Sequence, residues 1–177
     1  MSTKPYGEAY IARCHKTLKQ WGAPLDGWFV TNTYDCLEEA NELFTCELCG
    51  CTQVRIVHVM EHLQYFERIS VGCICAGIMD GDILAAKERE RMVKNRAKRR
   101  KNYLKRIWEQ KPYGVSFLRY RGEDLKIYES HVHPGQFTAS LGNTTTSHHK
   151  GKPITNFLMA VYAAFDLIDP VEEIRNA

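Results

Sequence analysis

The 177-residue sequence lacks the features of several large functional classes. No apolar run approaches the roughly 18 residues that a membrane-spanning helix needs, so we expect no membrane partner. A glycine-rich phosphate loop, a serine-elbow motif and a dinucleotide fingerprint are all missing, which argues against a nucleotide-dependent enzyme. The N-terminal sequence MSTKPYGEAY has no apolar core of the kind found in signal peptides, so we expect a cytoplasmic protein.

Acidic residues are scarce in one segment. Residues 87–111 hold 12 of the 24 Lys and Arg residues but 3 of the 21 Asp and Glu residues, so this segment carries +9 and the rest carries −6. Between Lys94 and Arg106 there is no acidic residue, and like charges one helical turn apart destabilise an isolated helix. A basic segment on an acidic body favours a polyanionic partner over a uniformly solvated surface.

The seven cysteines are an odd number and are clustered. In a reducing cytosol, clustered cysteines are more often metal ligands than disulfides. CELCG allows two thiolates to reach one tetrahedral zinc ion, with glycine taking the backbone angles of a tight knuckle. VGCICAG supplies a second pair at the start of a helical pattern. We therefore predict a structural Zn²⁺ site formed by Cys46, Cys49, Cys73 and Cys75.

The fourth ligand is the open part of this prediction. Cys73 and Cys75 are separated by one residue, whereas structural zinc sites commonly use wider spacings. His62 is the first substitute for Cys73, followed by His58 and Cys51. The remaining cysteines, Cys14 and Cys36, are predicted to be small core residues, because free cysteine is often buried.

The hydrophobic pattern predicts an α+β fold. The N-terminal half contains a helix over residues 8–21, an extended segment over 27–35, a short helix over 36–44 and strands over 52–60 and 68–72. A long helix over 83–108, capped by Asp80 or Asp82, precedes strands over 114–122, 125–130 and 135–142, a polar loop over 143–153 and a helix over 154–168. We divide the chain into a helical N-terminal region (1–44), a zinc finger (45–80), a long basic helix (81–111) and a β-β-β-α module (112–177) with a three-stranded antiparallel sheet. The predicted elements follow the order of a treble-clef finger, which is a knuckle, then a hairpin, then ligands at the start of a helix.

The basic helix is predicted to contact nucleic acid. Arginine matches phosphate oxygens and guanine edges, and asparagine can read adenine in a major groove. Duplex DNA is favoured because a finger-supported helix often docks in a groove, and structured RNA is the alternative. The predicted contact residues are Lys94, Asn95, Arg96, Lys98, Arg99, Arg100, Lys101, Asn102, Lys105 and Arg106.

CELCG, VHVMEH and VGCICAGIMDGD, followed by a basic helix, resemble an uncharacterised family of bacterial and phage-encoded zinc-finger proteins. The resemblance covers about residues 40–110 and extends more loosely into the tail. It implies a treble-clef-like finger in a bacterium or in an infected host cell, and it implies no activity.

These observations predict a non-catalytic, regulatory zinc-finger protein that binds nucleic acid. One alternative is a metal-dependent nuclease of the His-Me finger type, because His58, Glu61 and His62 lie on or just after a predicted strand. The helix after Cys75 offers no second histidine or asparagine in the usual place for such a nuclease. A phage-encoded inhibitor that binds a host nucleoprotein is the second alternative.

Overall fold

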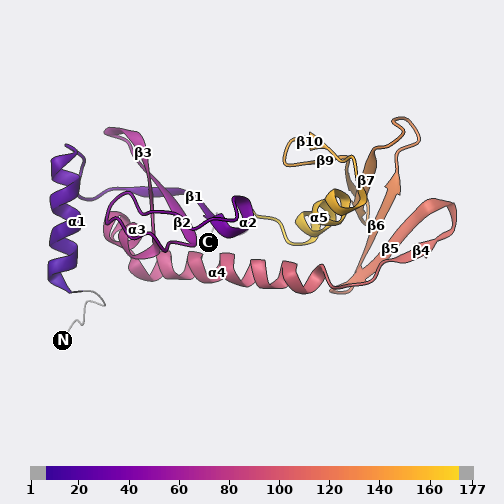
Figure 1. Ribbon diagram of the computed structural model, residues 1–177, viewed down its shortest axis with the longest axis horizontal. Coiled ribbons are helices and arrows are strands. Elements are labelled where there is room, and N and C mark those ends of the chain that lie inside the picture. Colours follow the sequence, from indigo (N-terminus) through magenta and orange to yellow (C-terminus); the bar gives the residue numbers. More distant parts are fainter. Residues whose placement is uncertain (1–6, 172–177) are drawn as a thin grey trace. The chain divides into compact units, whose positions relative to one another are not determined.

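The computed structural model describes residues 7–171 and has the predicted α+β character (Figure 1). The described chain forms two compact units, the first ending at Ala97 and the second beginning at Lys98. The predicted N-terminal region and zinc finger thus belong to one unit. In the described part of the chain, no helix is both long and apolar enough to cross a membrane.

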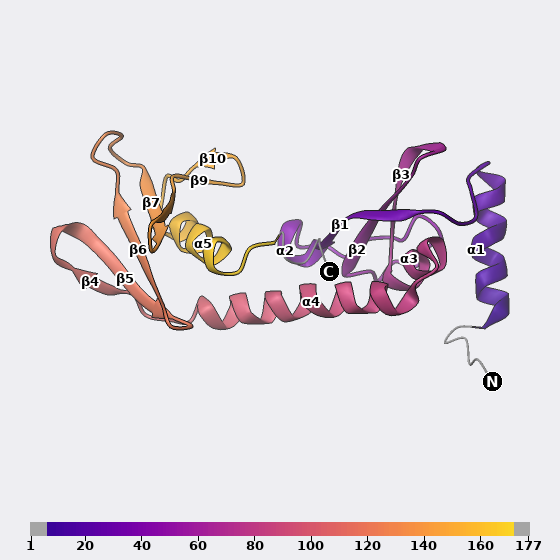
Figure 2. The ribbon, with the colours of Figure 1, turned by 180° about the vertical axis from the view of Figure 1, so that it is seen from behind.

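The first unit is built on a three-stranded antiparallel sheet with the order β1-β2-β3. Helix α3 packs on this sheet and α1 contacts α3. Both ribbon views show α1 beside α3 (Figures 1 and 2). The elements of this unit are α1 (Glu8–Gln20), β1 (Phe29–Asp35), α2 (Cys36–Glu39), β2 (Ile56–His62), β3 (Tyr65–Val71), α3 (Cys73–Asp80) and the greater part of α4 (Ile83–Tyr103).

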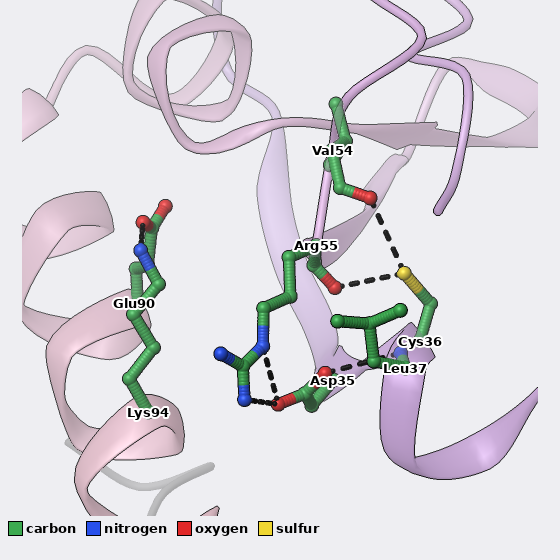
Figure 3. Close-up of polar contacts among 7 residues, drawn as sticks. All are labelled: Asp35, Cys36, Leu37, Val54, Arg55, Glu90 and Lys94. Carbon is green, nitrogen blue, oxygen red and sulfur yellow. Dashed lines mark hydrogen bonds and ion pairs between the residues drawn. The ribbon is translucent and has the colours of Figure 1, made fainter. Parts of the chain in front are cut away.

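Local sequence signals explain most of these elements. Helix α1 buries Cys14 and Leu18 from its predicted apolar stripe. Asp35 caps α2 by accepting a hydrogen bond from the backbone nitrogen of Leu37 at 3.1 Å (Figure 3), although α2 ends well before the predicted residue 44. The connection expected at residues 61–67 largely extends β2 and β3, so the hairpin turn is tight.

Helix α4 begins as predicted and ends earlier. Asp82 Oδ1 accepts a hydrogen bond from the backbone nitrogen of Ala85 at 2.9 Å, which confirms one of the two proposed caps. Gly77 of α3 makes room for the first residue of α4, since a Cβ at this glycine would lie 2.5 Å from the Cα of Ile83. The helix ends at Tyr103 rather than at Trp108.

The second unit contains a five-stranded antiparallel sheet with the order β4-β5-β6-β7-β8, not the predicted three-stranded sheet. The additional edge strands, EQK and TTT, are short and polar, so they lack the apolar alternation that identifies a strand in a sequence. The elements of the second unit are β4 (Glu109–Lys111), a 3₁₀ turn (Pro112–Gly114), β5 (Val115–Tyr120), β6 (Glu123–Glu129), β7 (Phe137–Leu141), β8 (Thr144–Thr146), β9 (His148–His149), β10 (Lys152–Pro153) and α5 (Phe157–Ile168).

A separate hydrophobic core holds the second unit together. Helix α5 packs on β6 and β7 (Figure 1), and its residues Ala160 and Phe165 are buried against Leu125 and Ile127. Tyr103 is also fully buried here, and its hydroxyl donates a hydrogen bond to the carbonyl of Val161 at 2.9 Å. The last turn of α4 is thereby part of this core.

Candidate metal centre

Three cysteine thiols converge in the first unit. Cys46 and Cys49 lie in the loop before β2, and Cys75 lies in the first turn of α3. Their sulfur atoms all lie within 4.8 Å of one another, with Cys46 and Cys75 buried and Cys49 half-buried. A group of this kind could hold a metal ion. Three of the four predicted ligands are thus brought together.

The loop that carries Cys46 and Cys49 is a hydrogen-bonded knuckle. Gly50 adopts φ = 74°, and its nitrogen donates to the Cys46 carbonyl at 2.9 Å. The Cys46 nitrogen donates to the carbonyl of Cys51 at 2.8 Å. The nitrogen of Gly72 donates to the Cys46 sulfur at 3.5 Å, which links the knuckle to the residue before α3. These contacts fix the direction of the Cys46 side chain.

The thiols of this group shift one another's pKa values. A hydrogen bond from Cys75 lowers the pKa of Cys46 to about 5, against the opposing effect of burial. Hydrogen bonds to Cys14 and Cys46, together with burial, raise the pKa of Cys75. Neighbouring S–H groups therefore stabilise a thiolate at Cys46. A bound cation would take over this role, because metal ligation removes the protons from thiols.

Helix α1 adds two side chains that the sequence did not identify. The Cys14 thiol is 1% exposed and forms a hydrogen bond with Cys75 that lowers the pKa of Cys14. The Tyr10 hydroxyl lies 3.1 Å from the Cys75 sulfur. Cys14 is on a buried face, as predicted, but that face packs against the thiols. Its position 32 residues before Cys46 gives no motif by which it could have been found.

Cys73, the remaining predicted ligand, lies outside the thiol group. Its sulfur is in a different cluster with His58 and Glu90. The physical reason is helix geometry, because residues two apart in a helix point about 200° apart around its axis. Two cysteines at this spacing in α3 cannot readily face the same ion.

The predicted substitutes for Cys73, namely His62, His58 and Cys51, also lie outside the thiol group. His62 Nδ1 accepts a hydrogen bond from the backbone nitrogen of Gln64 at 2.9 Å, and its ring centroid lies 5.4 Å from that of Trp28. Cys51 is exposed and belongs to neither cluster. Burial, with a smaller effect of Arg89, lowers the pKa of His58 to about 4, so its imidazole is neutral at physiological pH.

A cavity of about 860 Å³ borders both clusters. Its wall includes Cys46, Cys49 and Cys75 from the first cluster and Cys73 and Glu90 from the second. Five cationic side chains also line it, namely Arg13, Arg55, Lys87, Arg91 and Lys94. Three of these cations pair with carboxylates, namely Arg55 with Asp35, Arg91 with Glu88 and Lys94 with Glu90.

Four of the ten predicted nucleic-acid contacts have intramolecular partners or are buried. Lys94 forms an ion pair with Glu90 (Figure 3). Arg99 pairs with Asp169 in the second unit at 2.6 Å, and the Arg100 guanidinium stacks over the ring of Tyr162 at 4.5 Å from its centroid. Arg96 is 7% exposed. Such side chains are less available to phosphate than the sequence alone indicates.

The other six predicted contacts are exposed. They are Asn95, Lys98, Lys101, Asn102, Lys105 and Arg106. Lys98, Lys101 and Lys105 recur at intervals of three and four, so they follow one face at the end of α4 and into the turn after it. None of these three forms an ion pair with any residue between 7 and 171.

Known proteins do not identify this centre. The chain has no match among protein-family models, curated proteins or solved structures. The resemblance of CELCG and VGCICAGIMDGD to bacterial and phage-encoded finger proteins therefore stays a prediction from motifs. Inference about function rests on the arrangement of the side chains.

Proposed function

We propose that this chain is a zinc-stabilised, non-catalytic protein that binds nucleic acid through its second unit. The observation that carries the proposal is the row of Lys98, Lys101 and Lys105. These lysines are exposed, follow one face of the end of α4 and the turn after it, and form no ion pair within the described residues. Their mutual repulsion is unfavourable unless an anionic partner offsets it.

The neighbours of the lysine row suit a polynucleotide. Asn102 is exposed beside it and offers both a hydrogen-bond donor and an acceptor, while Arg106 adds a further cation just beyond the helix. Regularly spaced cations fit the repeating phosphates of a strand better than a single small anion. Duplex DNA remains the favoured partner and structured RNA the alternative.

Zinc has a structural role in this proposal. Cys46, Cys49 and Cys75 supply three sulfur ligands. Cys14 is the candidate for the fourth, because it packs in the same core and Cys75 lowers its pKa, although its sulfur is not among the three that lie within 4.8 Å of one another. An all-sulfur set suits tetrahedral zinc and leaves no position for a substrate. The knuckle, the β2-β3 hairpin and the ligand at the start of α3 support a treble-clef arrangement with one ligand supplied by α1.

The nuclease alternative has less support within residues 7–171. His58 is fully buried in β2, and His62 is engaged by Trp28 and Gln64 instead of facing a common site with His58. The alternative of a nucleoprotein inhibitor predicts that the purified chain binds a host protein and not nucleic acid alone. A binding experiment with purified components distinguishes the two.

The test compares two variants with equal loss of charge. One replaces Lys98, Lys101 and Lys105 by Ala, and the control replaces the exposed Lys16, Lys19 and Lys152 by Ala. Fluorescence anisotropy with duplex DNA, single strands and structured RNA at two salt concentrations should show at least about tenfold weaker binding for the first variant alone. Three phosphate contacts on a duplex correspond to a log–log salt slope of roughly −2.7. Equal losses in both variants, or no binding by the unchanged chain, would overturn the proposal.

A further inference from the structure

A second group of ligand-type side chains lies in the first unit. His58 comes from β2, Cys73 from the first turn of α3 and Glu90 from α4. One ring nitrogen, one sulfur and one carboxylate oxygen from these residues lie within 4.8 Å of one another. The group shares no residue with the cluster of Cys46, Cys49 and Cys75.

The buried imidazole of His58 has an unused nitrogen. The residue is 0% exposed, and Nε2 has no hydrogen-bond partner among the described residues. Nδ1 lies 3.4 Å from Oγ1 of Thr33, the residue directly opposite His58 in the β1-β2 ladder. A polar atom buried without a partner is costly, so the lone nitrogen requires an explanation. In the tautomer in which Nδ1 donates its proton to Thr33, Nε2 keeps the lone pair that a metal ligand needs.

The carboxylate of Glu90 is already in contact with a cation. Lys94 approaches it from the next turn of α4, and Figure 3 shows that this pair lies at the side of α4 facing Arg55. The lysine is about half exposed, so it can withdraw into solvent without burying its charge. A divalent ion at the same carboxylate would replace one positive partner by another.

We propose that His58, Cys73 and Glu90 form a second metal site that takes a borderline divalent transition ion such as Zn²⁺ or Co²⁺. One nitrogen, one sulfur and one oxygen donor are all accepted by these ions, whereas Mg²⁺ and Ca²⁺ prefer oxygen donors alone. A thiolate and a carboxylate together neutralise the charge of the ion. Three protein ligands leave a fourth tetrahedral position open.

The open position faces the cavity. Cys73 and Glu90 line this space of about 860 Å³, whereas His58 lies behind them in the sheet. A metal ion there would be reached from solvent through this cavity. Water or another small ligand from solvent would fill the fourth position.

Cobalt distinguishes the two sites in the full-length protein. Dialysed protein is titrated with Co²⁺, bound metal is counted by mass spectrometry, and the cobalt absorption reports the ligand set. The unchanged chain should bind two equivalents. Glu90→Gln and Cys73→Ser should each weaken the second equivalent at least about tenfold while the absorption of the all-sulfur site persists. Retention of that absorption shows that these variants are folded.

The matched control is Glu88→Gln, which removes an exposed carboxylate of α4 that pairs with Arg91 outside the cluster. It should still bind two equivalents. A single equivalent in the unchanged chain would overturn the second site, as would undiminished binding of two equivalents by Cys73→Ser. Neither result bears on nucleic-acid binding.

Discussion

At the scale of single residues, the most informative side chain is Cys14. The direction of each thiol decides which of the seven cysteines can be a metal ligand and which is a structural core residue. Cys36 points to the carbonyls of Val54 and Arg55, at 3.2 Å and 2.9 Å (Figure 3). Cys14 is buried in one core with Cys46 and Cys75, and Cys75 lowers its pKa. Two buried cysteines therefore have different expected effects when replaced.

Cys14→Ser should weaken the more tightly bound zinc equivalent at least about tenfold, because a hydroxyl is a poor substitute for a thiolate ligand. Competition with a chromophoric chelator measures this affinity. Cys36→Ser is the control, because it makes the same substitution at a buried cysteine outside the thiol group, and it should leave the zinc affinity unchanged. If Cys14→Ser holds zinc as tightly as Cys36→Ser, the fourth ligand is not Cys14.

The residue scale also marks the limit of sequence reasoning. The pair in CELCG was predictable, because a two-residue spacing followed by glycine encodes a knuckle locally. The choice between Cys73 and Cys75 was not, because it depends on which side of α3 faces the knuckle. Cys14 could not be found at all, since its role arises only when α1 packs against α3.

At the scale of elements, α3 and α4 pack closely where Gly77 meets Ile83, and no other described glycine would bring an added Cβ so near a neighbouring atom. Gly77 lies in the interior of α3, where alanine would normally be the better helix former. A methyl group at this position would lie 2.5 Å from the Cα of Ile83 and 2.6 Å from its Cγ1. The first contact is with backbone, so a change of rotamer does not relieve it.

Gly77→Ala should therefore destabilise the first unit by about 1 to 3 kcal/mol, despite the better helix propensity of alanine. Urea unfolding followed by circular dichroism gives the free energy of unfolding. Gly7→Ala serves as the control, because nothing lies within 4 Å of its added Cβ. That change should cost about 0.5 to 1 kcal/mol, because alanine is a poorer N-cap than glycine. A stabilised Gly77→Ala protein would show that α3 and α4 are less tightly packed than described.

Elements were predictable where apolar periodicity was strong. Helix α1, strand β6 and helix α5 have clear patterns and were predicted within a few residues of their observed ends. The short strands β4 and β8 were missed because their side chains are polar, and pairing with β5 and β7 determines their conformation. The end of α4 was placed too late, because Leu104 and Trp108 continue its apolar seam past the last helical residue.

At the scale of the whole molecule, the proposed zinc site predicts that the two units depend unequally on metal. All seven cysteines lie in the first unit, and three of them, Cys14, Cys46 and Cys75, belong to its main core with Leu18 and Met60. The core of the second unit consists of aromatic and aliphatic side chains around Phe165. Removal of metal should therefore affect the first unit alone.

Treatment with a strong zinc chelator tests this at the level of single amides. Loss of a tightly bound ion removes about 3 kcal/mol or more from the first unit, which lowers its Tm by roughly 12 °C or more for a unit of this size. Hydrogen exchange should then accelerate for amides of β2, β3 and α3. Amides of β6, β7 and α5 should keep their protection, because their burial and their hydrogen bonds do not involve the thiols. Equal acceleration of exchange in both units would mean that the second core depends on the first. The conformation of the lysine row at the end of α4 would then also depend on the metal.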